Sequence, residues 1–194
     1  MIDETLMIKP VLHRLPFVTT IFGLALAVGA PSPASAQVSK KPGAKPNPEF
    51  LMAKMTGKWV MRGTINDEKV THDVTVDRIL NRQYVRIHEI SREKDASGKP
   101  AYEAWIHIAW DQANQEFAVM WLDNTGITNF SADGVGHGKP QGDRIPFVWK
   151  LADGTGIRNT FAFDRPSNSW SWSIDNVDKA GKSSPFGRVT LRRK

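Results

Sequence analysis

From Val60 to Arg192 the side chains alternate in character with a period of two. β-Branched or aromatic residues occupy every second position of segments about six to ten residues long, and Gly, Pro, Asn or Asp bounds each segment. This pattern is typical of an all-β antiparallel meander, barrel or sandwich. The predicted strands are Val60–Ile65, Val70–Val76, Gln83–Ser91, Ala101–Trp110, Glu116–Leu122, Ile127–Ala132, Pro146–Leu151, Ile157–Phe163, Ser169–Val177 and Gly187–Arg192.

One short helix is predicted before the first strand. Asn47 is a good N-cap, Pro48 suits the first helical position, and Glu49 is favourable in the first turn. The helix should end at Thr56-Gly57.

Residues 1–36 have the order of a secretory signal peptide. Lys9 and Arg14 precede an apolar stretch from Leu15 to Ala30, and Ala34-Ser35-Ala36 supplies the small residues of a cleavage site. The alternative is a membrane anchor, but the apolar stretch is short of the ~20 residues that a span needs. Cleavage after Ala36 predicts a periplasmic or secreted protein, with residues 37–47 as a flexible linker and residues 48–194 as one domain.

The composition indicates a packed domain that has no disulfide bonds. The chain has seven Trp and no Cys, so it predicts an aromatic core and excludes disulfides and thiolate metal sites. Its net charge of +6 is compatible with nucleic-acid binding. Export would place cytoplasmic nucleic acid out of reach, so no nucleic acid is expected, and an anionic envelope surface is the better partner for this charge.

Turn residues predict that consecutive strands pair as hairpins. Asp123 and Gly126 end the segment Leu122-Asp-Asn-Thr-Gly, where the aspartate can accept backbone hydrogen bonds and the glycine supplies a positive φ. We therefore assign this aspartate to turn structure and not to catalysis.

Some strand faces mix aromatic and ionisable residues, as the wall of a lined cavity would. His72 shares a face with Val70, Val74 and Val76, so it is expected to be buried or half-buried. Two strands are ambiguous, because a shift of one residue exchanges their faces. Their mixed faces carry Tyr84, Arg86 and His88, and Trp105 and His107.

Three segments resemble a secreted bacterial lipocalin-like (calycin) β-barrel domain family of unknown function. Thr56-Gly57-Lys58-Trp59 is similar to the G-x-W opening of such barrels, Phe117–Gly126 to an aromatic-x-x-x-W-x-D-x-x-G strand and turn, and Ile79–Tyr84 to the start of the third strand. The resemblance spans most of residues 50–194 and departs at Gly134–Gly142. It implies an antiparallel up-and-down barrel of about 8–10 strands with one short N-terminal helix, and it implies no reaction.

The resemblance also implies a structural role for Gly57 and Trp59. In lipocalin-like barrels the tryptophan closes the base against a basic side chain of the last strand, which here would be Arg188 or Arg192. A guanidinium lying on an indole face stabilises by ~1 kcal/mol or more when shielded.

Enzyme signatures are missing from the sequence. It contains no G-x-S-x-G, S-x-x-K or H-E-x-x-H motif, so no catalytic residue is assigned. Gly134–Pro140 looks like a phosphate loop but lacks the following Ser or Thr, and we predict a flexible hairpin loop there. No cofactor is predicted; His88 with His107 across two strands is the pair that could hold haem or a metal.

The favoured hypothesis is an exported barrel that binds a small, largely apolar molecule in its interior. One alternative is an envelope accessory protein that acts through its basic outer surface on another macromolecule, and a second is an enzyme with a site in the barrel mouth. Arg86 or His88 would meet an acidic group of the ligand. The predicted cavity lining is Tyr84, Arg86, His88, Trp105, His107, Trp121, Asn159, Phe161, Trp170 and Trp172.

Overall fold

A computed structural model describes residues 47–126 and 132–194. The predicted signal peptide, almost all of the predicted linker, and residues 127–131 of the strand predicted over Ile127–Ala132 lie outside the described residues.

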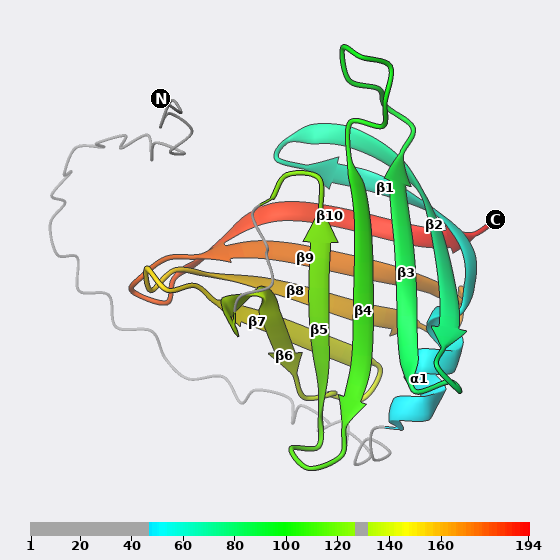
Figure 1. Cartoon of the computed structure of the whole chain (residues 1–194), viewed down its shortest axis with the longest axis vertical. Coiled ribbons are helices and arrows are strands. Elements are labelled where there is room, and N and C mark those ends of the chain that lie inside the picture. Colours follow the sequence, from blue (N-terminus) through cyan, green and yellow to red (C-terminus); the bar gives the residue numbers. More distant parts are fainter. Residues whose placement is uncertain (1–46, 127–131) are drawn as a thin grey trace, which may run out of the picture. The chain divides into compact units, whose positions relative to one another are not determined.

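The described residues form ten antiparallel strands that close into a barrel (Figure 1). Each strand pairs with its neighbours in sequence, and β1 closes the barrel by pairing with β10. The predicted all-β up-and-down barrel with one short helix before the first strand is confirmed. The elements are α1 (Pro48–Met55), β1 (Gly57–Ile65), β2 (Glu68–Ile79), β3 (Tyr84–Ser91), β4 (Glu103–Asp111), β5 (Glu116–Asp123), a 3₁₀ turn (Ala132–Gly134), β6 (Val135–Gly138), β7 (Arg144–Lys150), β8 (Gly156–Asp164), β9 (Ser169–Val177) and β10 (Ser183–Arg193).

Helix α1 lies at one end of the barrel, and the β3–β4 connection extends from the other end (Figure 1). The Asn47 side chain caps the helix by accepting a hydrogen bond of 3.0 Å from the Phe50 amide. Leu51, Met52 and Met55 are buried in the hydrophobic core. The helix therefore closes one end of the barrel with apolar side chains.

Trp59 is buried next to the end of α1, and its cationic partner is neither Arg188 nor Arg192. The Arg193 guanidinium carbon lies 3.9 Å from the centre of the Trp59 ring. Trp59 and Arg193 are direct partners in the β1–β10 ladder, so they share a face, whereas Arg192 belongs to the opposite face. Arg188 instead pairs with Asp175.

Gly57 is required by this arrangement. Its φ of +132° is unfavourable for other residues, and a Cβ there would lie 1.9 Å from Nη1 of Arg193. That guanidinium also donates to the Thr56 carbonyl at 2.7 Å, just after the end of the helix.

Residues Val135–Gly138 form strand β6, so the prediction of a flexible loop over Gly134–Pro140 was wrong there. β6 pairs with β5 and, at His137, with β7. A Cβ on Gly136 would lie 2.4 Å from Cε2 of Trp149, so the absence of a side chain leaves room for the indole. The alternation of side chains did not reveal β6, because Gly136 and Gly138 carry no side chains.

Gly136→Ala is expected to lower the free energy of unfolding by about 1–3 kcal/mol, because the added methyl overlaps the Trp149 ring. Urea unfolding measures the change. His137→Ala, one residue away on the outer side of the strand, is the control and should change little, because its ion pair with Glu116 is exposed. Equal stability of Gly136→Ala and the unmodified protein would contradict this packing.

The free energy of unfolding is expected to depend on pH through Asp73, which lies on the outer side of β2. Hydrogen bonds first from Arg92 and then from Lys194 lower its pKa from 3.8 to about 2, against the opposing effect of burial. A lowered carboxyl pKa stabilises the fold above about pH 4, and this contribution is lost as pH falls toward 2.

The Asp73 contribution should stay below ~1 kcal/mol because the side chain is 38% exposed. The difference in unfolding free energy between the unmodified protein and Asp73→Asn should therefore shrink between pH 4 and pH 2. A difference that stays constant over this range would contradict the assignment.

Candidate ligand-binding cavity

A cavity of about 410 Å³ lies inside the barrel and is partly open to solvent. Its rim comes from the β1–β2 hairpin, the β3–β4 connection, the end of β5 and Phe186 of β10. The β3–β4 connection is at the end away from α1 (Figure 1). A second void, beside Trp59, measures only about 10 Å³, so that region is close-packed. The larger volume falls in the range of small-molecule sites.

Aromatic side chains form much of the cavity wall. Trp121 lies edge-on to Trp149 and to Trp172, with ring centres 6.3 Å and 6.1 Å apart. Phe161 stacks on Trp172 at 4.2 Å. Contacts of this kind hold the rings in place, so the wall presents a large apolar surface with little freedom to rearrange.

A buried histidine–glutamate pair lies in the same wall. Nδ1 of His72 donates to Oε1 of Glu89 at 2.6 Å, and the side chains are 3% and 2% exposed. The burial expected for His72 is confirmed. Tyr102 stacks on its ring with centres 5.6 Å apart. The hydrogen bond and the stacking together fix the orientation of the His72 ring.

Tyr102 connects the wall to the rim. Trp121 Nε1 donates to the Tyr102 hydroxyl at 2.8 Å, and that hydroxyl donates to Oδ2 of Asp123 at 3.3 Å. Burial, and then the negative charges of Glu89 and Asp123, raise the pKa of Tyr102, so the hydroxyl stays protonated.

The turn predicted at Asp123 is present. Its other carboxyl oxygen accepts from the Thr125 amide at 2.9 Å, and Gly126 has a φ of +70°. Asp123 thus serves the turn and also lines the cavity.

Three residues of the lining contain a buried polar atom that lacks a hydrogen-bond partner. These atoms are Oε2 of Glu89, Nε1 of Trp149 and Oδ1 of Asn159. Leaving such a group unpaired is unfavourable by roughly 1–3 kcal/mol, so native proteins rarely do so without a reason. The set comprises two acceptors and one donor.

Five of the ten predicted lining residues lie on inward faces. Trp121, Asn159 and Trp172 line the cavity. Phe161 and Trp170 are buried in the core outside that lining, and Trp170 Nε1 donates to the Lys54 carbonyl at 3.4 Å.

The other five lie on the outer face, which corrects the predicted placement. The inward residues of β3 and β4 are the alternate ones, such as Val85, Ile87 and Ile106, which are completely buried or nearly so. This register places Tyr84, Arg86, His88, Trp105 and His107 outside the cavity.

Contacts across the outer face account for the mixture of residue types there. The His88 ring stacks on Trp105 with centres 3.8 Å apart, and the Arg86 guanidinium lies 5.3 Å from the same ring. His88 also pairs with Glu103 at 2.7 Å. Burial, and secondarily Arg86, lower the pKa of His107. Ionisable residues beside aromatic ones therefore mark a stacked outer surface here.

Sequence reasoning missed Glu89, Tyr102 and Trp149. Glu89 follows Val85 and Ile87 on the apolar face of β3, and this position was the available signal for its burial. Tyr102 precedes β4, and nothing in the alternation marks it as part of a cavity wall.

His88 and His107 are diagonal neighbours on the outer face of β3 and β4. In the β3–β4 ladder His88 faces Trp105 and His107 faces Arg86. No group of three or more His, Asp or Glu residues in the part of the chain that the structure describes could hold a metal ion.

Within that same part, every helix is too short or too polar to cross a membrane. Comparison of the chain with protein-family models and with curated proteins gives no match.

Proposed function

We propose that this protein is a lipocalin-like barrel that binds a small, largely apolar molecule in its interior. The observation that carries the proposal is a 410 Å³ cavity walled by Trp121, Trp149 and Trp172 above a close-packed base. The lipocalin-like assignment is supported by helix α1 at the base and by Arg193 stacked on Trp59.

We also propose that binding takes place outside the cytoplasm. The support is the order of basic, apolar and small-residue segments in residues 1–36. N-terminal sequencing of the exported protein should begin at Gln37, and a mature chain that still contains Phe17 would contradict export by signal cleavage.

A cavity-filling variant tests the binding site. Val70 lines the cavity, whereas the next residue, Thr71, lies on the outer side of β2. The uncharged fluorophore N-phenyl-1-naphthylamine should brighten with the unmodified protein and with Thr71→Trp. Val70→Trp should weaken its binding at least about tenfold, a free-energy loss of ~1.4 kcal/mol.

Two results would contradict interior binding. One is equal binding by Val70→Trp and Thr71→Trp. The other is the absence of any bound small molecule, both with this probe and in native mass spectrometry of protein purified from its host.

The outer face of β3 and β4 favours a second candidate, an accessory protein that binds an anionic envelope surface. Tyr84 on β3 and Trp105 on β4 are 39% and 38% exposed there. Arg86 lies on the same face, and its guanidinium is 5.3 Å from the centre of the Trp105 ring. Vesicles containing phosphatidylglycerol should bind the protein, and binding should weaken in Trp105→Ala and collapse by about 200 mM salt. Vesicle binding that is unaffected both by Trp105→Ala and by 200 mM salt would contradict this candidate.

A further inference from the structure

The cavity lining is acidic although the chain is basic. Glu68, Glu89, Glu93 and Asp123 line it together with one lysine, Lys69, which is a formal balance of −3 with His72 neutral. The whole chain carries +6. Charge is therefore segregated, with negative groups gathered at the one large cavity among the described residues.

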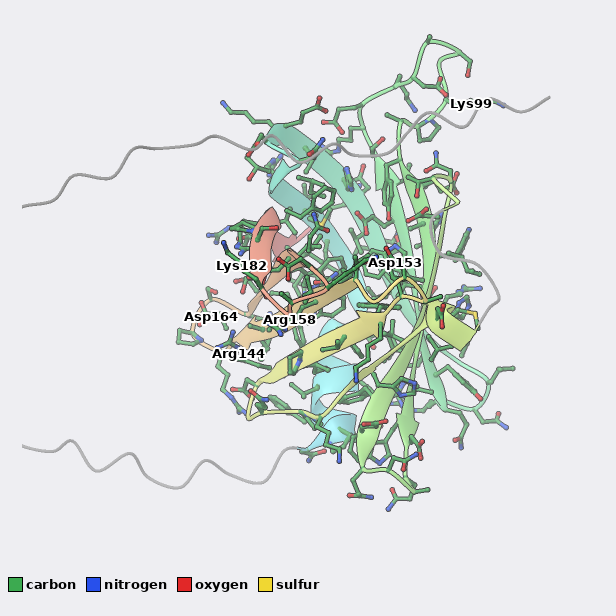
Figure 2. All side chains as sticks on the ribbon, turned by 90° about the vertical axis from the view of Figure 1, so that its left-hand side faces the viewer. Lys99, Arg144, Asp153, Arg158, Asp164 and Lys182 are labelled. Atoms are coloured by element: carbon green, nitrogen blue, oxygen red, sulfur yellow. The ribbon has the colours of Figure 1, made fainter. Side chains whose placement is uncertain are left out.

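None of these four carboxylates forms an ion pair with lysine or arginine in the described ranges. The arginine and lysine ion pairs there use Glu49, Asp73, Asp77, Asp143 and Asp175. Figure 2 shows charged side chains projecting around the outside of the barrel and its loops, among them Arg144, Asp164 and Lys182. The cations of these ion pairs are thus held by carboxylates outside the lining, and Lys69 lines the cavity itself.

Glu89 is the most buried of the four carboxylates. His72 satisfies Oε1, but Oε2 has no partner although the side chain is only 2% exposed. A buried carboxylate is stable only when its charge is compensated or both oxygens accept hydrogen bonds. The unpartnered Oδ1 of Asn159 adds a second acceptor to the same lining.

The aromatic wall suits the same kind of ligand. A cation within about 6 Å of the face of a tryptophan ring is attracted by the ring quadrupole, more strongly where water is excluded. Trp121, Trp149 and Trp172 belong to the same lining as the carboxylates. A lining of rings and acceptors therefore complements an apolar body that bears N–H donors.

We propose that the cavity selects an apolar molecule carrying a protonated amine over neutral and acidic molecules of the same shape. Glu89, the buried carboxylate of the lining, would supply the negative counter-charge for the amine. This inference rests on the proposed interior binding. It replaces the predicted acidic ligand group, because Arg86 and His88 lie on the outer face.

Three matched probes test the preference: 1-naphthylmethylamine, 1-naphthalenemethanol and 1-naphthaleneacetate, each titrated calorimetrically at neutral pH and low salt. The amine should bind at least about tenfold more tightly than the alcohol, and the acetate should bind most weakly. Glu89→Gln should remove the amine's advantage and leave the affinity for the alcohol within about twofold.

Glu103→Gln is the matched control, because Glu103 also pairs with a histidine but lies on the outer face. It should keep the full preference for the amine. If Glu89→Gln fails to fold, Glu93→Gln serves instead: Glu93 is exposed on the rim, and the variant should lower the amine's advantage about threefold.

The outcomes separate the two proposals. If the alcohol binds and the amine has no advantage, or if Glu89→Gln keeps that advantage, the selection for amines is overturned while interior binding stands. If the acetate binds most tightly, the selection is likewise overturned. If none of the three probes binds, interior binding fails and the selection fails with it.

Discussion

Trp59→Ala is expected to lower the free energy of unfolding by about 3–5 kcal/mol. Trp59 is only 1% exposed, and its Nε1 donates to the Met55 carbonyl at 2.8 Å, near the end of α1. The substitution removes the indole, leaves that carbonyl without its donor and exposes the stacked Arg193 guanidinium. Urea or thermal unfolding of the purified domain measures the loss.

Two arginine variants serve as a matched pair for this prediction. Arg193→Ala should destabilise by about 1 kcal/mol or more, because the stack on Trp59 and the bond to the Thr56 carbonyl are both lost. Arg192→Ala, on the opposite face of the same strand, should change stability by less than about 0.5 kcal/mol. Equal effects of the two variants, or a Trp59→Ala variant as stable as the unmodified protein, would contradict the base described above.

His72→Phe is expected to lower the free energy of unfolding by about 3–5 kcal/mol. Phenylalanine retains a ring next to Tyr102 but removes the donor to Glu89, so a carboxylate that is 2% exposed loses its one hydrogen bond. Denaturant unfolding with the slope held in common with the unmodified protein gives the change.

A double variant and an outer-face control complete this test. His72→Phe with Glu89→Leu should recover most of the lost stability, because replacing both members of a buried pair by apolar groups is often nearly neutral. His88→Phe, at the partly exposed His88–Glu103 pair, should have an effect below ~1 kcal/mol. If the free energy of unfolding of His72→Phe is within about 0.5 kcal/mol of that of the unmodified protein, the described His72–Glu89 hydrogen bond is contradicted.

Local rules were enough to predict most of the secondary structure. Asn47 and Pro48 predict the start of α1, and period-two alternation locates nine strands outside the stretch around residues 127–138. The failure at β6 has a local cause as well: Gly136 and Gly138 leave room for neighbouring strands and carry no side chains whose alternation could be read.

By itself, the amino-acid sequence determined nine of the strands, the helix and the turn at Asp123, because each depends on residues close together in the chain. Only the tertiary structure decided which faces of β3 and β4 point inward, since alternation looks the same from either face until the strands are paired around a closed barrel. That choice placed Glu89 inside and Arg86 outside. It thereby reversed the charge expected for the cavity.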